Sequence, residues 1–233
     1  FRSATSGSPG PVHLQFAGNE GQIDQQEAEM TLQVDKKYIK LPPHRPVADS
    51  NSISAAAEIL SNSVKPVLVV GGGAKSSEAS KEVLTLAEKL NIPVVTSLNG
   101  KDVFPSTHRL SAGVVGTYSR ESANKTVLES DLVFFIGTQA GGMTTHFWAV
   151  PPIGKPAIQL DIDPEALGRN YSLKVALNGD VKATLQKLIN VCDSTSAQKR
   201  ENWVKTVETI VITVIMERRI IIIISQEIIV TII

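Results

Sequence analysis

The fold is decided by one stretch of the sequence, Lys65-Pro66-Val67-Leu68-Val69-Val70-Gly71-Gly72-Gly73. An unbroken apolar run of this length predicts a β-strand that is buried on both faces, as in a parallel sheet. The three glycines end the strand, and residues 79–90 follow them with the apolar spacing of a helix. Strand, glycine turn and helix together predict one unit of an α/β fold.

Four further apolar runs repeat this pattern, at residues 93–98, 132–136, 157–162 and 174–177. Two more helices are predicted where apolar residues fall on one face, at residues 53–60 behind Ser52 as N-cap, and at residues 181–192. The alternation predicts a doubly wound α/β domain. Its sheet should be mostly parallel and Rossmann-like, with helices on both faces.

Ligands of such folds bind at the carboxyl ends of the strands, where small residues gather in this chain. Gly71, Gly72 and Gly73 would let a phosphate approach backbone N–H groups at the start of a helix. That helix is expected to begin at Ser76 or Ser77. The stretch is neither a Walker A loop nor a Gly-x-Gly-x-x-Gly fingerprint. A tight turn between a strand and a closely packed helix explains the same residues, and both interpretations stay open.

Other strand ends carry further candidates for nucleotide binding. Small residues follow the runs at 93–98 and 132–136, namely Gly113, Gly116, Thr117, Gly137 and Thr138. Near the last two strands, the carboxylates of Asp161, Asp163 or Asp180 would accept hydrogen bonds from ribose hydroxyls. Asp163 and Asp180 fit equally well as N-caps of following helices. These strand ends predict a groove that is able to hold a nucleotide.

Composition and charge exclude several classes of function. Lysine plus arginine number 23, as do aspartate plus glutamate, so the formal net charge is zero and draws the chain to neither nucleic acid nor an anionic membrane. Cys192 is the single cysteine and forms no internal disulfide, and the first residues lack the apolar stretch of a signal peptide. A cytoplasmic location is therefore expected. The histidines lack the close spacing of a metal site, standing at His13, His44, His108 and His146.

Two segments lie outside the alternating pattern. Residues 144–148, Thr-Thr-His-Phe-Trp, form an aromatic cluster that either packs against a neighbouring domain or contacts substrate. Half of residues 210–233 are isoleucine, and charged or polar residues break this tail into pieces too short to span a membrane. Exposed, the pieces would be β segments prone to aggregation. The alternative is that their side-chain identities do not represent a natural sequence, and the tail carries no functional assignment.

The strand and glycine motifs resemble the central domain of the thiamine-diphosphate enzymes, the family of acetolactate synthase, benzoylformate decarboxylase and pyruvate oxidase. The resemblance rests on residues 65–73 and on Leu86-Ala87-Glu88-Lys89-Leu90-Asn91-Ile92-Pro93-Val94-Val95-Thr96. Further matches follow in the same order, at residues 113–117, 130–133, 159–164, 168–171 and 179–180. Together they cover roughly residues 7–191.

This resemblance implies a domain organisation. Residues 1–22 look like a remnant of the family's pyrimidine-binding domain, whose last strand would be residues 11–16. Residues 23–46 would be a linker and residues 47–194 the central nucleotide-fold domain. Residues 195–233 remain a C-terminal segment of doubtful sequence.

The resemblance also places the chemistry outside this chain. In the family, the glutamate that activates the cofactor lies in the pyrimidine domain, and the Gly-Asp-Gly stretch that leads to the magnesium-diphosphate ligands lies in a third domain. Neither occurs here, so the fragment is expected to bind no thiamine diphosphate or Mg²⁺ and to be inactive. It has no assigned catalytic residue or metal ligand. Its expected partners are the missing pyrimidine and diphosphate domains, in a parent that is a homodimer or homotetramer.

For that parent, the resemblance implies cleavage or formation of a C–C bond beside a carbonyl, mostly in 2-keto acids. Acetolactate synthases hold FAD across this domain and carry Arg-Phe-Asp-Asp-Arg after the fourth strand, where residues 137–142 here read Gly-Thr-Gln-Ala-Gly-Gly. The missing arginine favours a decarboxylase, lyase or synthase-like enzyme, and leaves FAD or ADP as candidate ligands. Two alternatives are a stand-alone nucleotide-binding module of the electron-transfer flavoprotein or sirtuin type, and a structural domain with an empty groove.

Overall fold

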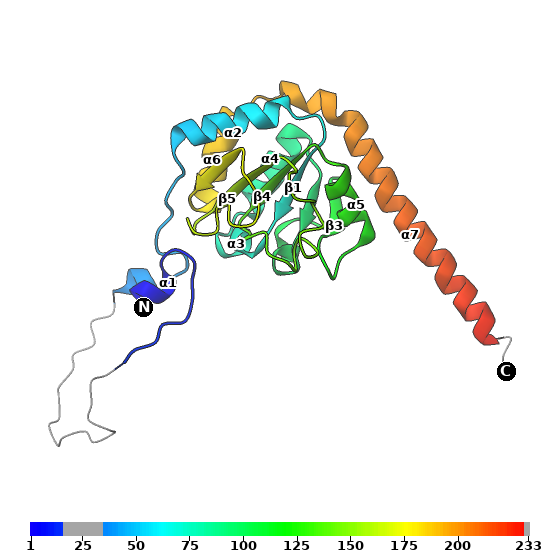
Figure 1. Ribbon diagram of the computed structural model, residues 1–233, viewed down its shortest axis with the longest axis horizontal. Helices are drawn as coiled ribbons and strands as arrows, with labels where there is room; N and C mark the ends of the chain where they lie inside the picture. The colour runs from blue at the N-terminus through cyan, green and yellow to red at the C-terminus, as the bar shows by residue number, and fades with distance from the viewer. Residues whose placement is uncertain (16–34, 231–233) are drawn as a thin grey trace, which may run out of the picture. The chain divides into compact units, whose positions relative to one another are not determined.

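The structure is a computed structural model that describes the backbone of residues 1–15 and 35–230, and side chains up to residue 216 (Figure 1). The chain divides into two units, Phe1–Arg45 and Pro46–Ile233, which are described separately. The first unit contains a helical turn, α1 (Arg2–Thr5), and a 3₁₀ turn, η1 (Lys36–Ile39). Asp35 caps η1 by accepting a hydrogen bond from the Lys37 N–H.

The strand that the resemblance implies at residues 11–16, as part of a pyrimidine-binding domain, stays a prediction. Residues 11–15 are irregular, and Phe16 lies outside the described residues. The physical reason is that a strand needs a neighbour for its N–H and C=O groups, and in the described parts of the first unit no segment pairs with it. Most of the linker expected at residues 23–46 also lies outside the described residues.

The second unit is built on a six-stranded sheet in the order β3-β2-β1-β4-β5-β6, and every neighbouring pair is parallel. The doubly wound α/β fold is therefore confirmed. The strands are β1 (Pro66–Val70), β2 (Val94–Thr96), β3 (Ser111–Val114), β4 (Leu132–Ile136), β5 (Ala157–Asp161) and β6 (Val175–Asn178). The sequence interpretation missed β3, whose Ser-Ala-Gly-Val lacks the large apolar residues of the other strands.

Helices connect the strands. They are α2 (Ser50–Asn62), α3 (Gly72–Ser76), α4 (Ser80–Leu90), α5 (Glu121–Glu129), α6 (Val181–Val191) and α7 (Glu201–Val230), with 3₁₀ turns η2 (Leu98–Val103) and η3 (Ser194–Arg200). The expected N-cap Ser52 is wrong, because the Asp49 side chain accepts the N–H groups of Asn51 and Ser52. The glycine turn also opens its helix earlier than expected: α3 begins at Gly72, and α4 follows at Ser80.

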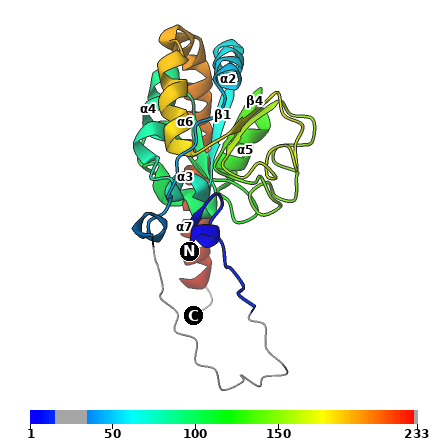
Figure 2. The ribbon, with the colours of Figure 1, turned by 90° about the vertical axis from the view of Figure 1, so that its left-hand side faces the viewer.

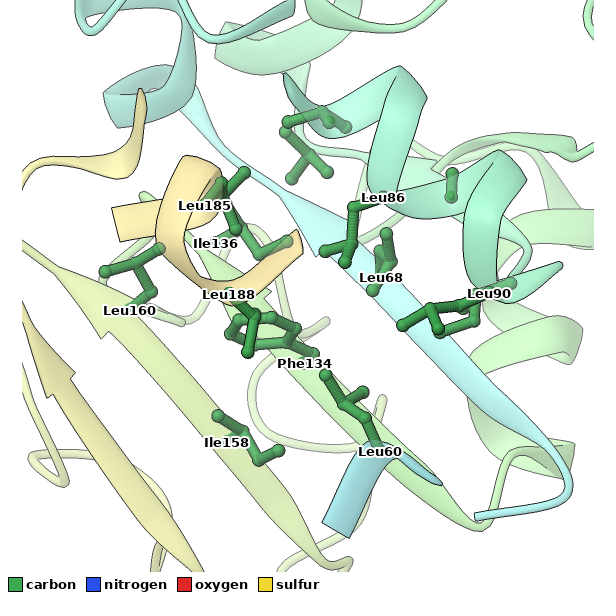
Figure 3. Packing of buried hydrophobic residues seen from close by; sticks show 14 of the residues in the cluster. Leu60, Leu68, Leu86, Leu90, Phe134, Ile136, Ile158, Leu160, Leu185 and Leu188 are labelled. Atoms are coloured by element: carbon green, nitrogen blue, oxygen red, sulfur yellow. The ribbon is translucent and has the colours of Figure 1, made fainter. Parts of the chain in front are cut away.

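The two faces of the sheet carry separate apolar clusters. Alternate residues of β1 and β4, such as Leu68 and Phe134, pack with α2, α4 and α6 on one face. Figure 3 shows Leu86 and Leu90 of α4 and Leu185 and Leu188 of α6 meeting these strand residues. The intervening residues, among them Val69, pack with α5 and the first part of α7 on the other face. Figure 2 shows α4 and α6 on one side of the strands and α5 on the other.

The start of α7 is part of this core. Arg200 is fully buried, and Trp203 is buried beside it and donates from Nε1 to the Pro66 carbonyl at 2.9 Å. The compact unit therefore continues beyond the boundary expected at residue 194. The expectation of β segments in the isoleucine-rich tail is wrong, because the chain is helical through Val230. Local i→i−4 hydrogen bonds satisfy a helix without the neighbouring strand that a β segment would need.

Basic side chains close the carboxyl ends of four helices. Arg200 donates to the Leu60 and Ser63 carbonyls at the end of α2, and at 2.6 Å to Leu90 at the end of α4. Lys199 also donates at the end of α2, to Ser61. Two further lysines do the same elsewhere: Lys89 donates to Ile189 of α6 at 2.7 Å, and Lys155 donates to Leu128 and Ser130 at the end of α5, at 2.9 and 2.6 Å. Helix-end carbonyls that lack an intrahelical partner are thereby satisfied.

Candidate functional site

The chain reverses its direction of winding between β1 and β4, the point at which open α/β sheets bind ligands. The glycines expected to cradle a phosphate lie at this point, but they contact the protein's own backbone. The Gly71 N–H donates to Ile136 at 2.9 Å, and the Gly73 N–H donates to Gly137 at 2.9 Å. A phosphate could bind these two N–H groups only if both hydrogen bonds were broken.

Close packing explains why these positions are glycine. A Cβ on Gly71 would lie 2.3 Å from the Gly137 carbonyl oxygen, and one on Gly137 would lie 2.5 Å from the Ala74 nitrogen. Gly137 also has φ +59°, in the left-handed region that glycine adopts without strain. On the other side of β1, a Cβ on Gly100 would lie 2.6 Å from the Val70 carbonyl oxygen. The geometry therefore favours the tight-turn interpretation of the glycine stretch.

The residues after β3 are joined to the loop after β4. Gly113 and Gly116 have φ of +104° and +113°, and a Cβ on Gly116 would lie 2.1 Å from the Met143 carbonyl oxygen. The same carbonyl accepts the Thr117 N–H at 2.9 Å. The Thr117 hydroxyl oxygen is buried, and within the described residues it has no hydrogen-bond partner.

Thr138 is held by a residue that the sequence interpretation missed. Gln159, buried in β5, donates from Nε2 to the Thr138 carbonyl at 3.0 Å and accepts the Gly168 N–H at 3.1 Å. Gln159 thus ties the loop after β4 to the turn after β5. A glutamine within the apolar run Ala-Ile-Gln-Leu-Asp is the signal that would have marked it, because buried amides need partners.

The three candidate carboxylates have different surroundings. Asp161 ends β5 and is buried, and its Oδ1 accepts the Asp163 N–H at 3.0 Å. Burial raises the pKa of the Asp161 carboxyl above its ordinary value; the negative charge of Asp163 raises it further, while backbone hydrogen bonding opposes the rise. Asp163 accepts the Glu165 N–H at 2.9 Å, as a capping residue would, but residues 164–168 form only turns, so the helix expected after it is absent.

Asp180 has a structural role. Its Oδ1 accepts the Ala183 N–H at 3.0 Å as the N-cap of α6, and its Oδ2 accepts the Ser77 hydroxyl at 2.7 Å. The Ser77 oxygen in turn accepts the Lys182 N–H at 2.9 Å. The capping interpretation of Asp180 is therefore confirmed, and its carboxylate also fixes the end of α3 against α6.

Little of this edge suggests acid–base or nucleophilic chemistry. Cys192 lies elsewhere, and burial raises its pKa to about 11, so its thiol stays protonated at neutral pH. Within the residues that the structure describes, no group of three or more His, Cys, Asp or Glu side chains could hold a metal ion. What the edge offers is small residues, one buried hydroxyl without a partner among the described residues, and one buried carboxylate.

The sequence matches the family described as "Thiamine pyrophosphate enzyme, central domain" over residues 53–188, more than half of the chain. The chain belongs to this family. The family recognition made from the strand and glycine motifs is thereby confirmed. The β1–β4 reversal and the glycine turn lie within the matched residues.

Several relatives are longer multidomain proteins. The chain is 35% identical over 214 residues to a probable acetolactate synthase large subunit of Methanocaldococcus jannaschii, covering 89% of this chain and 35% of that protein. It is 33% identical over 192 residues to the glyoxylate carboligase of Escherichia coli O157:H7, covering 82% and 31%. The acetolactate synthase large subunit of Corynebacterium glutamicum is 32% identical over 208 residues, covering 88% and 32%. The chain therefore spans about a third of the curated relatives it matches.

In the part of the chain that the structure describes, no helix is both long enough and apolar enough to cross a membrane.

Proposed function

We propose that the chain is the central domain of a thiamine-diphosphate-dependent enzyme that forms or cleaves a C–C bond beside the carbonyl of a 2-keto acid. Family membership carries the proposal, and relatives described as acetolactate synthase and glyoxylate carboligase support it. The parent enzyme would hold thiamine diphosphate and Mg²⁺ between its pyrimidine and diphosphate domains and act in the cytoplasm as a homodimer or homotetramer. Decarboxylation and carboligation both lie within this class.

Within the parent, the central domain would act mainly as a scaffold. Its switch-point glycines close β1 on β4 through backbone hydrogen bonds, and its helix ends are fixed by buried or half-buried cations. These features stabilise one arrangement of the sheet edge. They support a rigid unit that holds the cofactor-binding domains in place.

The isolated 233-residue chain should be catalytically silent. Incubation with thiamine diphosphate, Mg²⁺ and pyruvate, glyoxylate or benzoylformate should release no more carbon dioxide than a sample without protein. The full-length parent, assayed in parallel, should release carbon dioxide in a cofactor-dependent manner. Cofactor-dependent release by the chain alone would overturn the assignment of the chemistry to the other domains.

A second role is binding of FAD or ADP at the carboxyl edge of the sheet. The orphaned Thr117 hydroxyl and the buried Asp161 favour it, since both would gain partners from a bound ribose or phosphate. The hydrogen bonds already made by Gly71 and Gly73 count against a phosphate at the glycine turn. The phosphate of the ligand would therefore lie away from the glycine turn.

Thermal unfolding with FAD, ADP, FMN and NAD tests this role. A ligand at 100 times its Kd should stabilise the fold by about 2.7 kcal/mol, which raises Tm by roughly 5–10 °C. Thr117→Val should reduce that rise by roughly a third to a half, as expected for losing one hydrogen bond of about 1–1.5 kcal/mol to the ligand. The unliganded Tm should be unchanged or slightly higher, because the variant removes a buried hydroxyl that has no partner among the described residues. If none of the four nucleotides raises Tm, the nucleotide-binding role is wrong and only the scaffold role remains.

A further inference from the structure

The loop after β4 contains a run of backbone strain. His146, Phe147 and Trp148 are consecutive residues with φ of +46°, +53° and +62°, in the left-handed region that bulky residues rarely adopt. Such conformations persist where the surrounding structure enforces them, and they gather at functional positions. Three in succession, two of them aromatic, make this loop the most strained part of the described backbone.

Specific hydrogen bonds impose this conformation. Thr145 is fully buried; its hydroxyl donates to the Gly141 carbonyl at 3.1 Å and accepts the Trp148 N–H at 3.1 Å. The Phe147 N–H donates to the Gly142 carbonyl at 2.7 Å. The loop is therefore held in one shape, and that shape does not bury the aromatic side chains that follow Thr145.

Four large side chains are instead exposed on this loop and on the adjoining loop after β3. The exposed fractions are 70% for Tyr118, 49% for Met143, 65% for Phe147 and 42% for Trp148. The hydrogen bond from the Thr117 N–H to the Met143 carbonyl joins the two loops. We call these four residues the aromatic platform. Exposed apolar side chains held on a fixed backbone are typical of an interaction surface.

We propose that the aromatic platform docks a domain of the parent enzyme that lies outside residues 1–233. This inference rests on the proposed function. Tyrosine, tryptophan, phenylalanine and methionine are the residue types enriched at the centres of protein interfaces. The chain spans about a third of its relatives, so most of the parent lies outside it and must be joined to this domain.

An apolar partner surface suits the platform better than a charged one. All four members are uncharged, and the formal net charge of the chain is zero, so no long-range field steers the contact. Fixing the backbone of the loop before docking lowers the entropy lost on association. The strained backbone at Phe147 and Trp148 is thus explained by the exposed position in which it holds their side chains. Burying these side chains in the domain would not require this conformation.

The double variant Phe147→Asn/Trp148→Asn separates docking from folding. Asparagine tolerates the left-handed region, and both side chains are exposed, so the isolated chain should keep its Tm or gain a few degrees. A residue that merely stabilised the domain would lower Tm when replaced. Ile153→Asn is the matched control, because Ile153 is 69% exposed in the same β4–β5 connection but lies outside the platform.

Differential scanning calorimetry of the full-length parent provides the test. Docking should raise the unfolding temperature of the central domain above that of the isolated chain. The double variant should reduce this gain by about 5 °C or more, as expected for losing two interface anchors, while Ile153→Asn should leave it intact. An unchanged gain in the double variant would overturn the inference.

Two further readouts assign the outcome. If the isolated chain is a dimer by light scattering and the double variant is a monomer, the occupant is a second copy of this domain and the proposal is wrong. Cofactor-dependent activity of the wild-type parent tests the proposed function on its own. The parent could be inactive while the rise in its unfolding temperature still depends on the aromatic platform. That result would contradict the proposed function and support the docking surface.

Discussion

Replacement of Arg200 by methionine should lower the Tm of the domain by about 10 °C. The guanidinium is fully buried and donates to three carbonyls, those of Leu60, Ser63 and Leu90, at the ends of two helices. Burial lowers the pKa of Arg200 to about 10, so it remains charged at neutral pH. Removing it leaves buried carbonyls without donors, which we expect to cost about 3–5 kcal/mol after the regained desolvation energy is subtracted.

Arg169→Met is the matched control for this prediction. The Arg169 side chain is half exposed and pairs with Glu165 at 3.7 Å, so its loss should change the free energy of unfolding by less than about 0.5 kcal/mol. Urea titrations followed by circular dichroism would measure both variants. Equal midpoints for the two variants would show that the buried arginine is not needed to join the start of α7 to α2 and α4.

A single methyl group added at the β1–β4 reversal should lower the stability of the domain nearly as much. Gly137→Ala would place a Cβ 2.5 Å from the Ala74 nitrogen, at a φ of +59° that alanine avoids. We expect a loss of about 2–4 kcal/mol, because β4 and the start of α3 must separate to admit the methyl group. Thermal unfolding of the purified variant gives the value directly.

Gly141→Ala supplies the comparison. A methyl group on Gly141 would meet no atom within 4 Å, and the φ of Gly141 is not positive. The Tm of the Gly141→Ala variant should therefore match that of the wild type. If Gly137→Ala also matched the wild type, the close approach of β1 and β4 would not be a real constraint. A phosphate at the glycine turn would then become the better explanation of the small residues at these strand ends.

The sequence was sufficient to predict the fold because hydrophobic burial leaves a local signal. Strands β1 and β4 have the predicted bounds, since each is an unbroken run of large apolar residues covered on both faces. Strand β3 was not predicted, because its Ser-Ala-Gly-Val is short and made mostly of small residues. Only its pairing with β2 makes it a strand. Such pairing is a tertiary property without a local pattern.

The site was harder to predict than the fold. Gly71 and Gly137 are 66 positions apart, and the sequence around neither of them indicates their contact. In the fold, the backbone at Gly137 fills the space that a side chain on Gly71 would need. The role of Arg200 was hidden for the same reason, since its acceptors on α2 and α4 are distant in sequence. The capping role of Asp180 was easier to predict from the sequence, because an N-cap depends on the residues that directly follow it.

The cations at the helix ends have an electrostatic consequence for a sheet in which every strand is parallel. Helices α2, α4, α5 and α6 all end at the same edge, so the negative ends of their macrodipoles collect there. The side chains that close these ends neutralise that edge, and carboxylates cap α2 and α6 at the opposite one, through Asp49 and Asp180. Basic side chains thus lie at one end of these helices, and carboxylates cap two of them at the other. Added salt should have little effect on these contacts, because each cation lies within hydrogen-bonding distance of its carbonyls, well inside a Debye length of about 10 Å.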